Sequence, residues 1–456
     1  MTGDLRSAAA TAAAAAVPTV GPRPSEHLPH DCAPAAGATP GGATATPGAA
    51  PGGTATPGSR PTGTRLIGID AARGIALIGM MAIHVLDPVG PDSMPSVSWD
   101  LAAGKSAALF ALLAGVAVAF TSGRRERPRG RTWRAAAAAL VVRALLIAAV
   151  GLALGELVPR SAAGVILPYY ALLFLLAIPL LSLSVRGLLV TAAAIAITMP
   201  VLSHQLRSGM AEAIPSNPTF GDLLSRPGEL LTELLLTGTY PALPWLTYLC
   251  VGLAVGRTAL SSRRTVAVMA VSGLVLALGA RLVSWVLLDV VGGRESLEAG
   301  ALQTMTGDEY VDVLLWGPDG VTPTNTAWWL ATVSPHSSTP LDLAFTIGVG
   351  LSVLGVCILI GRTTATALRP LAAAGSMTLT LYGLHLLMLS SPLMPDSNGA
   401  SFLLQVGVVV AFGLLWARYH ARGPLEEVVA AATGAARRAV LRGAAGRRAG
   451  DARRRS

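Results

Sequence analysis

Apolar runs of about twenty residues alternate with short polar segments along most of the chain. A helix needs about 20 mostly apolar residues to cross the hydrocarbon core of a membrane. Stretches of this kind lie at 66–86, 101–121, 135–157, 162–183, 186–204, 237–257, 265–288, 341–361, 370–391 and 401–418. The pattern therefore predicts an all-α fold, a polytopic transmembrane helical bundle of about ten spans.

The composition agrees with a membrane location. The 456 residues are 52% hydrophobic and only 13% charged, whereas a soluble domain carries about 25% charged residues. So few charges cannot cover the surface of a water-soluble protein of this length, which excludes a cytosolic enzyme. We expect a multi-pass protein of the cell (plasma) membrane.

The net charge of +9 follows from arginines gathered in alternate loops. Basic loops face the cytoplasm, and those after the second, sixth and eighth predicted spans are arginine-rich, as is the C-terminal tail. The 289–340 loop instead holds seven acidic residues against a single Arg294. Both termini are therefore predicted to be cytoplasmic. The expected partners of the basic segments are membrane lipids and not nucleic acid. A homo-oligomer is left open. The long 289–340 loop is expected to cap a site outside.

Three segments differ in composition. Residues 1–64 are almost all Ala, Pro, Gly and Thr, too poor in large apolar side chains to offset the entropy of folding, so a disordered arm is predicted. Residues 65–420 form the predicted transmembrane domain. Residues 421–456 are predicted to be a basic cytoplasmic tail that touches anionic headgroups.

Three ionisable residues share one face of the first predicted span. Asp70 and Arg73 are spaced i, i+3 and can form an ion pair, and His84 lies about 16 Å further along the same stripe. Charged groups inside a span are costly and indicate function by default. We expect Asp70, Arg73 and His84 to be catalytic, with a structural ion pair and an interfacial histidine as the alternatives.

Other polar groups fall in the outer half of the predicted bundle. Lys105 and His336 are candidates for a site role. The alternative for Lys105 is a side chain that extends to the headgroups, and the alternative for His336 is a loop histidine without a site role. The pattern predicts an outward-opening cavity, floored by the Asp70–Arg73 pair and holding two or three histidines suited to proton transfer. The expected substrate-binding residues are Lys105, Asp100, Arg281, His336 and His385. No dinucleotide, P-loop or metal-ligand motif occurs in the sequence, so no metal is expected.

The segment from Arg65 to Met80 resembles the opening of the heparan-alpha-glucosaminide N-acetyltransferase catalytic domain, in an actinobacterial type. The spacing of Arg73 and His84 is also similar to that of the related acyltransferase-three membrane family. Further runs resemble the first group over residues 65–420, namely Ile166-Leu-Pro-Tyr-Tyr170, Tyr240-Pro-Ala-Leu-Pro-Trp245, Pro335-His-Ser-Ser-Thr-Pro340 and Leu379-Thr-Leu-Tyr-Gly-Leu-His385.

The resemblance implies transfer of an acyl (acetyl) group from acyl-CoA (acetyl-CoA), as co-substrate, to a hydroxyl or amine. The acceptor would be a small molecule, an envelope saccharide or a lipid headgroup. His84 would be the general base or would carry the acyl group, and Arg73 would orient it or bind the donor. The glucosaminide enzyme has its proposed catalytic histidine just before a Ser-Trp-Asn stretch; the comparable 95–100 has none. A transporter or flippase, or a non-catalytic relative, stays as an alternative.

Overall fold

The computed structural model describes residues 67–208, 210 and 216–455, with side chains up to residue 442. The predicted arm 1–64 and Arg65 lie outside these residues. Helices and turns make up the described chain, which contains no β-strand. The α-helices are α1 (Ile67–Val85), α2 (Val97–Ala102), α3 (Lys105–Ser122), α4 (Gly130–Leu157), α5 (Leu167–Leu176), α6 (Val185–Arg207), α7 (Phe220–Ser225), α8 (Pro227–Thr232), α9 (Ala242–Gly256), α10 (Arg263–Trp285), α11 (Gly293–Ala301), α12 (Gly307–Leu315), α13 (Pro340–Thr363), α14 (Arg369–Gly375), α15 (Thr378–Leu389), α16 (Asn398–Trp416) and α17 (Pro424–Arg455). Short 3₁₀ helices lie at Pro179–Ser182 and Ala327–Ala331, and π-helical turns at Glu233–Thr237 and Val286–Val290.

Seven helices in the described chain are long and apolar enough to cross a membrane, and up to nine if each of two bent pairs is one span. The seven are Ile67–Val85, Val97–Ser122, Gly130–Leu157, Val185–Arg207, Arg263–Val290, Pro340–Thr363 and Asn398–Trp416. The chain is therefore an all-helical protein with multiple candidate membrane spans, as its apolar pattern predicts. The cytoplasmic placement of its termini stays a prediction.

One predicted span, 162–183, is divided. Its α-helix, α5, has ten residues, which is about 15 Å and half the thickness of the hydrocarbon core. Pro179 begins a separate 3₁₀ helix after it, because proline cannot donate the backbone hydrogen bond that would continue an α-helix. This segment lines the interior of the bundle without being long enough to cross it alone.

The two bent pairs place helix ends inside the bundle. The segment Pro227–Thr237 meets α9 at 56°, and α14 meets α15 at 85°. Lone helix ends in hydrocarbon are tolerated only where protein or a water-filled cavity surrounds them. The break after Gly375 therefore points to a protein-lined interior near the start of α15.

Helices α1 and α14 pack so closely that glycine is required at their contact. A side chain at Gly375 would collide with the backbone of Asp70, and one at Gly74 would collide with the backbone of Leu371. This approach fixes the first half of α1 against the bent pair. It also places Asp70 and Arg73 beside the break between α14 and α15.

The long acidic segment after α10 has its own small core. Tyr310 packs edge-on against the buried Trp329, with ring centroids 5.9 Å apart. The segment covers one end of the bundle, since the Trp99 indole donates to the carbonyl of Leu315 at 3.3 Å and Trp245 donates to Ser338 at 3.0 Å. These contacts lie at the end where the sequence predicts a capped site.

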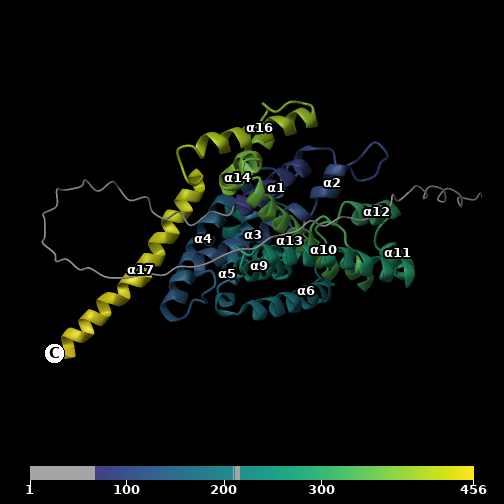
Figure 1. Cartoon of the computed structure of the whole chain (residues 1–456). Helices are drawn as coiled ribbons and strands as arrows, with labels where there is room; N and C mark the ends of the chain where they lie inside the picture. The colour runs from purple at the N-terminus through teal and green to yellow at the C-terminus, as the bar shows by residue number, and fades with distance from the viewer. Residues whose placement is uncertain (1–66, 209, 211–215, 456) are drawn as a thin grey trace, which may run out of the picture. The chain divides into compact units, whose positions relative to one another are not determined.

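The C-terminal segment 421–456, predicted from sequence to be a tail, consists mostly of one long helix, α17. Helix α17 runs from the start of α15 along α4 (Figure 1). Its first turn is tied to α15 by the Glu426 carboxylate, which accepts from the backbone N–H of Leu379 at 2.6 Å. Residues 424–430 are thus part of the bundle's wall.

Candidate active site

Asp70 and Arg73 form the ion pair that their spacing predicts. Arg73 Nη1 lies 3.2 Å from Asp70 Oδ1, and the Asp70 side chain is only 8% exposed, against 25% for Arg73. The close approach of Gly74 to α14 holds this turn of α1 in place. A rigid, partly buried arginine results, with its charge offset by a carboxylate on one side.

His84 and His385 meet at the opposite end of α1. His84 Nδ1 lies 3.0 Å from His385 Nε2 although 301 residues separate them. Their ring planes differ by 10° and the ring centroids are 5.3 Å apart. The helical stripe on α1 predicts that His84 faces the bundle, and the 85° bend before α15 brings His385 to it. Two predicted site histidines therefore form one unit.

Gln405 on α16 stands behind His385 and is not among the site residues predicted from sequence. Its Oε1 lies 2.6 Å from His385 Nδ1, and its Nε2 donates to Ser401 Oγ at 3.3 Å. Gln405 and His385 are both fully buried. The signal in the sequence was the spacing of Ser401 and Gln405, two polar residues at i, i+4 within an otherwise apolar span. This spacing places both side chains on one face of the helix, where they need a polar partner.

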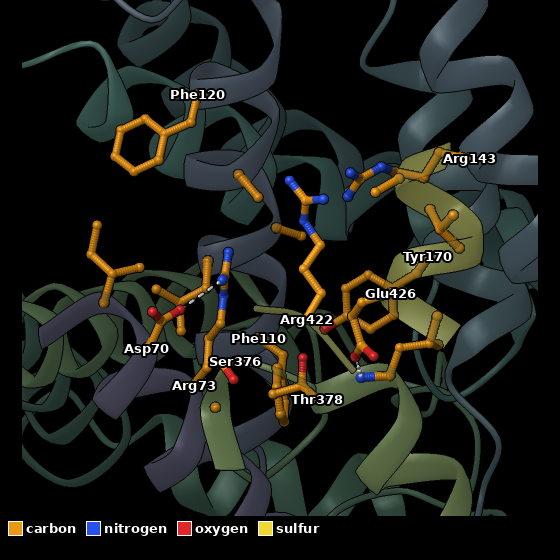
Figure 2. A pocket seen from close by; sticks show the side chains of 18 of the residues that line it. Asp70, Arg73, Phe110, Phe120, Arg143, Tyr170, Ser376, Thr378, Arg422 and Glu426 are labelled. Carbon is orange, nitrogen blue, oxygen red and sulfur yellow. Dashed lines mark hydrogen bonds and ion pairs between the residues drawn. The ribbon is translucent and has the colours of Figure 1, made fainter. Parts of the chain in front are cut away.

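A cavity of about 1230 Å³ lies on the Asp70–Arg73 half of the bundle. Figure 2 shows Arg73, Arg143 and Arg422 extending into it from α1, α4 and the segment before α17. Exposed residues 123–126 of the α3–α4 loop form part of its edge. From the sequence we expect an outward-opening cavity that is floored by the Asp70–Arg73 pair and holds the histidines. The pair does line this cavity, whereas no histidine is among its lining residues.

The cavity is basic. Its charged lining comprises five arginines and three carboxylates, namely Arg73, Arg124, Arg125, Arg143, Arg422, Asp70, Glu126 and Glu426. Two of the carboxylates are already engaged, Asp70 by Arg73 and Glu426 by the first turn of α15. Within the described chain neither Arg143 nor Arg422 has a carboxylate at ion-pair distance, and Arg143 lies over the Phe174 ring. The cavity therefore suits an anion.

The inner end of the cavity approaches the histidine pair. Met80 and Tyr382 line it, and they precede His84 and His385 by four and three residues. At ~1.5 Å per residue, the lining ends about 6 Å before His84 and about 4.5 Å before His385 along their helices. One continuous path thus leads from the basic loop, past the Asp70–Arg73 pair, to a point one turn below the histidines.

Lys105, Asp100 and Arg281 gather elsewhere. Lys105 Nζ donates to the Asp100 carbonyl at 2.6 Å, and both Lys105 and Arg281 lie over the Phe345 ring, at 5.6 and 5.0 Å from its centroid. Arg281 is exposed. Lys105 at the start of α3 and Arg281 near the end of α10 form a cationic group that does not line the large cavity.

His336 lies in the turn between the 3₁₀ helix Ala327–Ala331 and α13, with its backbone beside Gly104. Its ring stands edge-on to Tyr240 at 5.5 Å, and its Nδ1 is buried without a hydrogen-bond partner in the described chain. Burial lowers the pKa of His336 to about 4, and the charges of Arg160 and Lys105 act in the same direction. His336 is therefore neutral at physiological pH.

Within the described residues, no group of three His, Cys, Asp or Glu side chains gathers at metal-binding distance. The expectation of a metal-free site stays a prediction.

Residues 65–286 match the model of a family described as heparan-alpha-glucosaminide N-acetyltransferase, catalytic. The matched stretch contains the Asp70–Arg73 pair, His84 and Arg143, whereas His385, Gln405 and Arg422 lie beyond it. No curated protein matches the chain.

Proposed function

We propose, from the premise that this chain is a heparan-alpha-glucosaminide N-acetyltransferase catalytic-domain-like membrane protein, that it moves an acyl group from acyl-CoA to an envelope acceptor. The observation that carries the proposal is the arginine-lined cavity that ends one turn below His84. An acetyltransferase needs a site for a donor whose phosphates are anionic and whose thioester must reach a base.

Arg143 and Arg422 are the residues best suited to the donor's phosphates, because no carboxylate of the described chain neutralises them. Guanidinium groups bind phosphate oxygens in pairs of hydrogen bonds. Arg73 lines the same cavity but lies about 16 Å from His84 along α1. This distance favours donor binding over orientation of His84 as the role of Arg73.

His84 acts as the general base in this proposal. Its imidazole takes the proton of the attacking hydroxyl or amine while the acceptor's oxygen or nitrogen bonds to the thioester carbon. The carbon–sulfur bond then breaks, and the departing CoA thiolate takes the proton from His84. The products are an acylated acceptor and free CoA, so that atoms and charge balance.

The acceptor approaches from the side opposite the donor. The cationic group of Lys105 and Arg281 lies at that end of the bundle, which the acidic segment after α10 contacts through Trp99. We propose that this group binds the acceptor, which offers a hydroxyl or amine of an envelope saccharide or lipid headgroup. The protein would act in the cell (plasma) membrane.

The test combines donor binding with product analysis. CoA binding is measured on the purified full chain, and acylation of envelope glycans and lipids is measured by mass spectrometry in a deletion strain complemented with each variant. His84→Ala is expected to bind CoA normally and to abolish acylation, whereas His420→Ala, an exposed histidine, leaves both unchanged. Full acylation with His84→Ala would overturn the proposal. A stable acyl-enzyme formed without acceptor would assign His84 the carrier role instead.

The arginines provide a second arm. Losing one charge-assisted hydrogen bond costs about 1.5–3 kcal/mol, so Arg143→Gln and Arg422→Gln are each expected to weaken CoA binding by roughly 10-fold or more. Arg264→Gln, an exposed arginine outside the cavity, is the matched control. Unchanged affinity in both cavity variants would remove the donor from this cavity.

A further inference from the structure

A line of hydrogen-bonding groups runs through three helices and ends at His84. From the buried end it consists of Ser401 and Gln405 on α16, His385 on α15 and His84 on α1. The three links are 3.3, 2.6 and 3.0 Å long. Every link joins side chains alone, so the positions of hydrogens along the line are set by what each group can donate or accept.

The amide of Gln405 fixes those positions. Because its Nε2 donates to Ser401, its Oε1 faces His385 and can only accept. His385 must then carry its hydrogen on Nδ1, which leaves Nε2 as an acceptor. His84 must in turn donate from Nδ1 to that nitrogen. The Nε2 atom of His84 is consequently the unprotonated one.

The exposure of the side chains increases along the line from Gln405 to His84, which is the direction that a general base at His84 requires. Gln405 and His385 are fully buried, whereas His84 is half-buried. Within the described residues, His84 Nε2 makes no hydrogen bond. The line is therefore fully buried at its Gln405 end and less buried at its His84 end, where the basic atom lies.

A buried amide and imidazole could instead be a satisfied polar group that serves packing. That reading does not account for the direction of the line. Its least buried member is His84, one turn above the cavity. The direction is set by Gln405, whose two amide atoms are held by different partners. Packing alone needs no particular tautomer.

We infer that His385 and Gln405 are positioning residues that hold His84 in the tautomer with a free Nε2, so that this atom takes the proton of the acceptor. The inference rests on the proposed function and deepens it. During transfer the proton from the acceptor binds His84 Nε2, while the Nδ1–H bond to His385 stays donated. Release of the proton to the CoA thiolate restores the starting tautomer.

The first test removes the accepting amide. Gln405→Met keeps the approximate volume but frees His385 to reverse its tautomer and with it that of His84. A histidine held in the wrong tautomer costs a serine protease about 10⁴ in kcat, and we expect a loss of at least ~10² in kcat here. The affinity for CoA and the KM for donor should stay at wild-type values, because the cavity is not touched.

Rescue separates tautomer control from packing. Gln405→Glu keeps an acceptor toward His385 Nδ1 and is expected to recover kcat to within about 10-fold of wild type. Ser401→Ala leaves the amide free to rotate and is expected to lower kcat by roughly 10-fold. Val409→Ala, at another fully buried position on α16, lowers stability while keeping kcat and serves as the matched control.

The outcomes are decisive. Wild-type kcat in Gln405→Met, or a fall in kcat that follows thermal stability across all four variants including Val409→Ala, would overturn the inference. If Gln405→Glu does not fold, Ser401→Ala and Gln405→Met together still decide it. Failure of the proposed function is recognised separately, since His84→Ala would then keep its activity whatever the α16 variants do.

Discussion

Glu426 Oε2 lies 2.6 Å from Thr380 Oγ1, and this contact binds the start of α17 to the first turn of α15. The same carboxylate accepts from the backbone N–H groups of Leu379 and Thr380, so it satisfies the unpaired donors of a helix that begins inside the bundle. Glu426 stands at the cavity, which it lines together with Leu379.

Glu426→Ala is therefore expected to destabilise the protein and to weaken donor binding. Loss of a side-chain cap costs about 0.5–2 kcal/mol, and the cavity loses one wall contact. Thermal unfolding and CoA binding measure the two effects. Glu427→Ala removes an exposed neighbouring carboxylate and should change neither; equal effects of both variants would argue against the capping role.

Gly375→Ala is expected to separate α14 from α1. The added methyl group would collide with the Asp70 backbone, and overpacking of this kind costs about 1–3 kcal/mol or more. Acyl transfer should fall as well, because Asp70 and Arg73 move with α1. Gly407→Ala, where no atom lies within 4 Å of the new carbon, should instead leave unfolding temperature and activity at wild-type values.

CoA affinity is expected to fall as salt concentration rises, because phosphate binding at the arginine cavity displaces counterions and is screened by salt. The dependence should be shallower in Arg143→Gln and Arg422→Gln than in the wild type or Arg264→Gln. Isothermal titration at two salt concentrations gives this comparison. An affinity that does not respond to salt in the wild type would contradict an electrostatic donor site.

Stability is expected to fall on the acid side because of His336. Its pKa is about 4 in the folded protein and about 6.5 when unfolded, so the unfolded chain binds the proton first. The contribution is fully present above pH 6.5 and is lost as pH falls toward 4, with an upper bound of about 3 kcal/mol. Unfolding midpoints from pH 7 to 4 should decline less steeply in His336→Gln than in the wild type, and His420→Gln should keep the wild-type slope.

Local features of this protein were accessible from sequence. Apolar runs gave α1, α3, α4, α6, α10, α13 and α16, because burial in hydrocarbon demands about 20 apolar residues in a row. The i, i+3 spacing of Asp70 and Arg73 predicted their ion pair, since helical periodicity alone places them together. Resemblance at the first span pointed to the acetyltransferase family that residues 65–286 match.

Long-range placement was decided by the tertiary structure. No spacing rule joins His84 to His385, which are 301 residues apart. Ser401 and Gln405 mark a polar face of α16, but the sequence does not say that His385, which follows the 85° bend at α14–α15, is the partner of that face. The arginine-lined cavity arises where α1, α3, α4, α5, α15 and α17 leave space between them, and Arg422 belongs to a segment that composition assigns to a tail. Periodicity records only which face of a helix is buried. Which faces meet depends on helix bends and on glycine contacts such as Gly375 against Asp70, and these act between segments far apart in the chain.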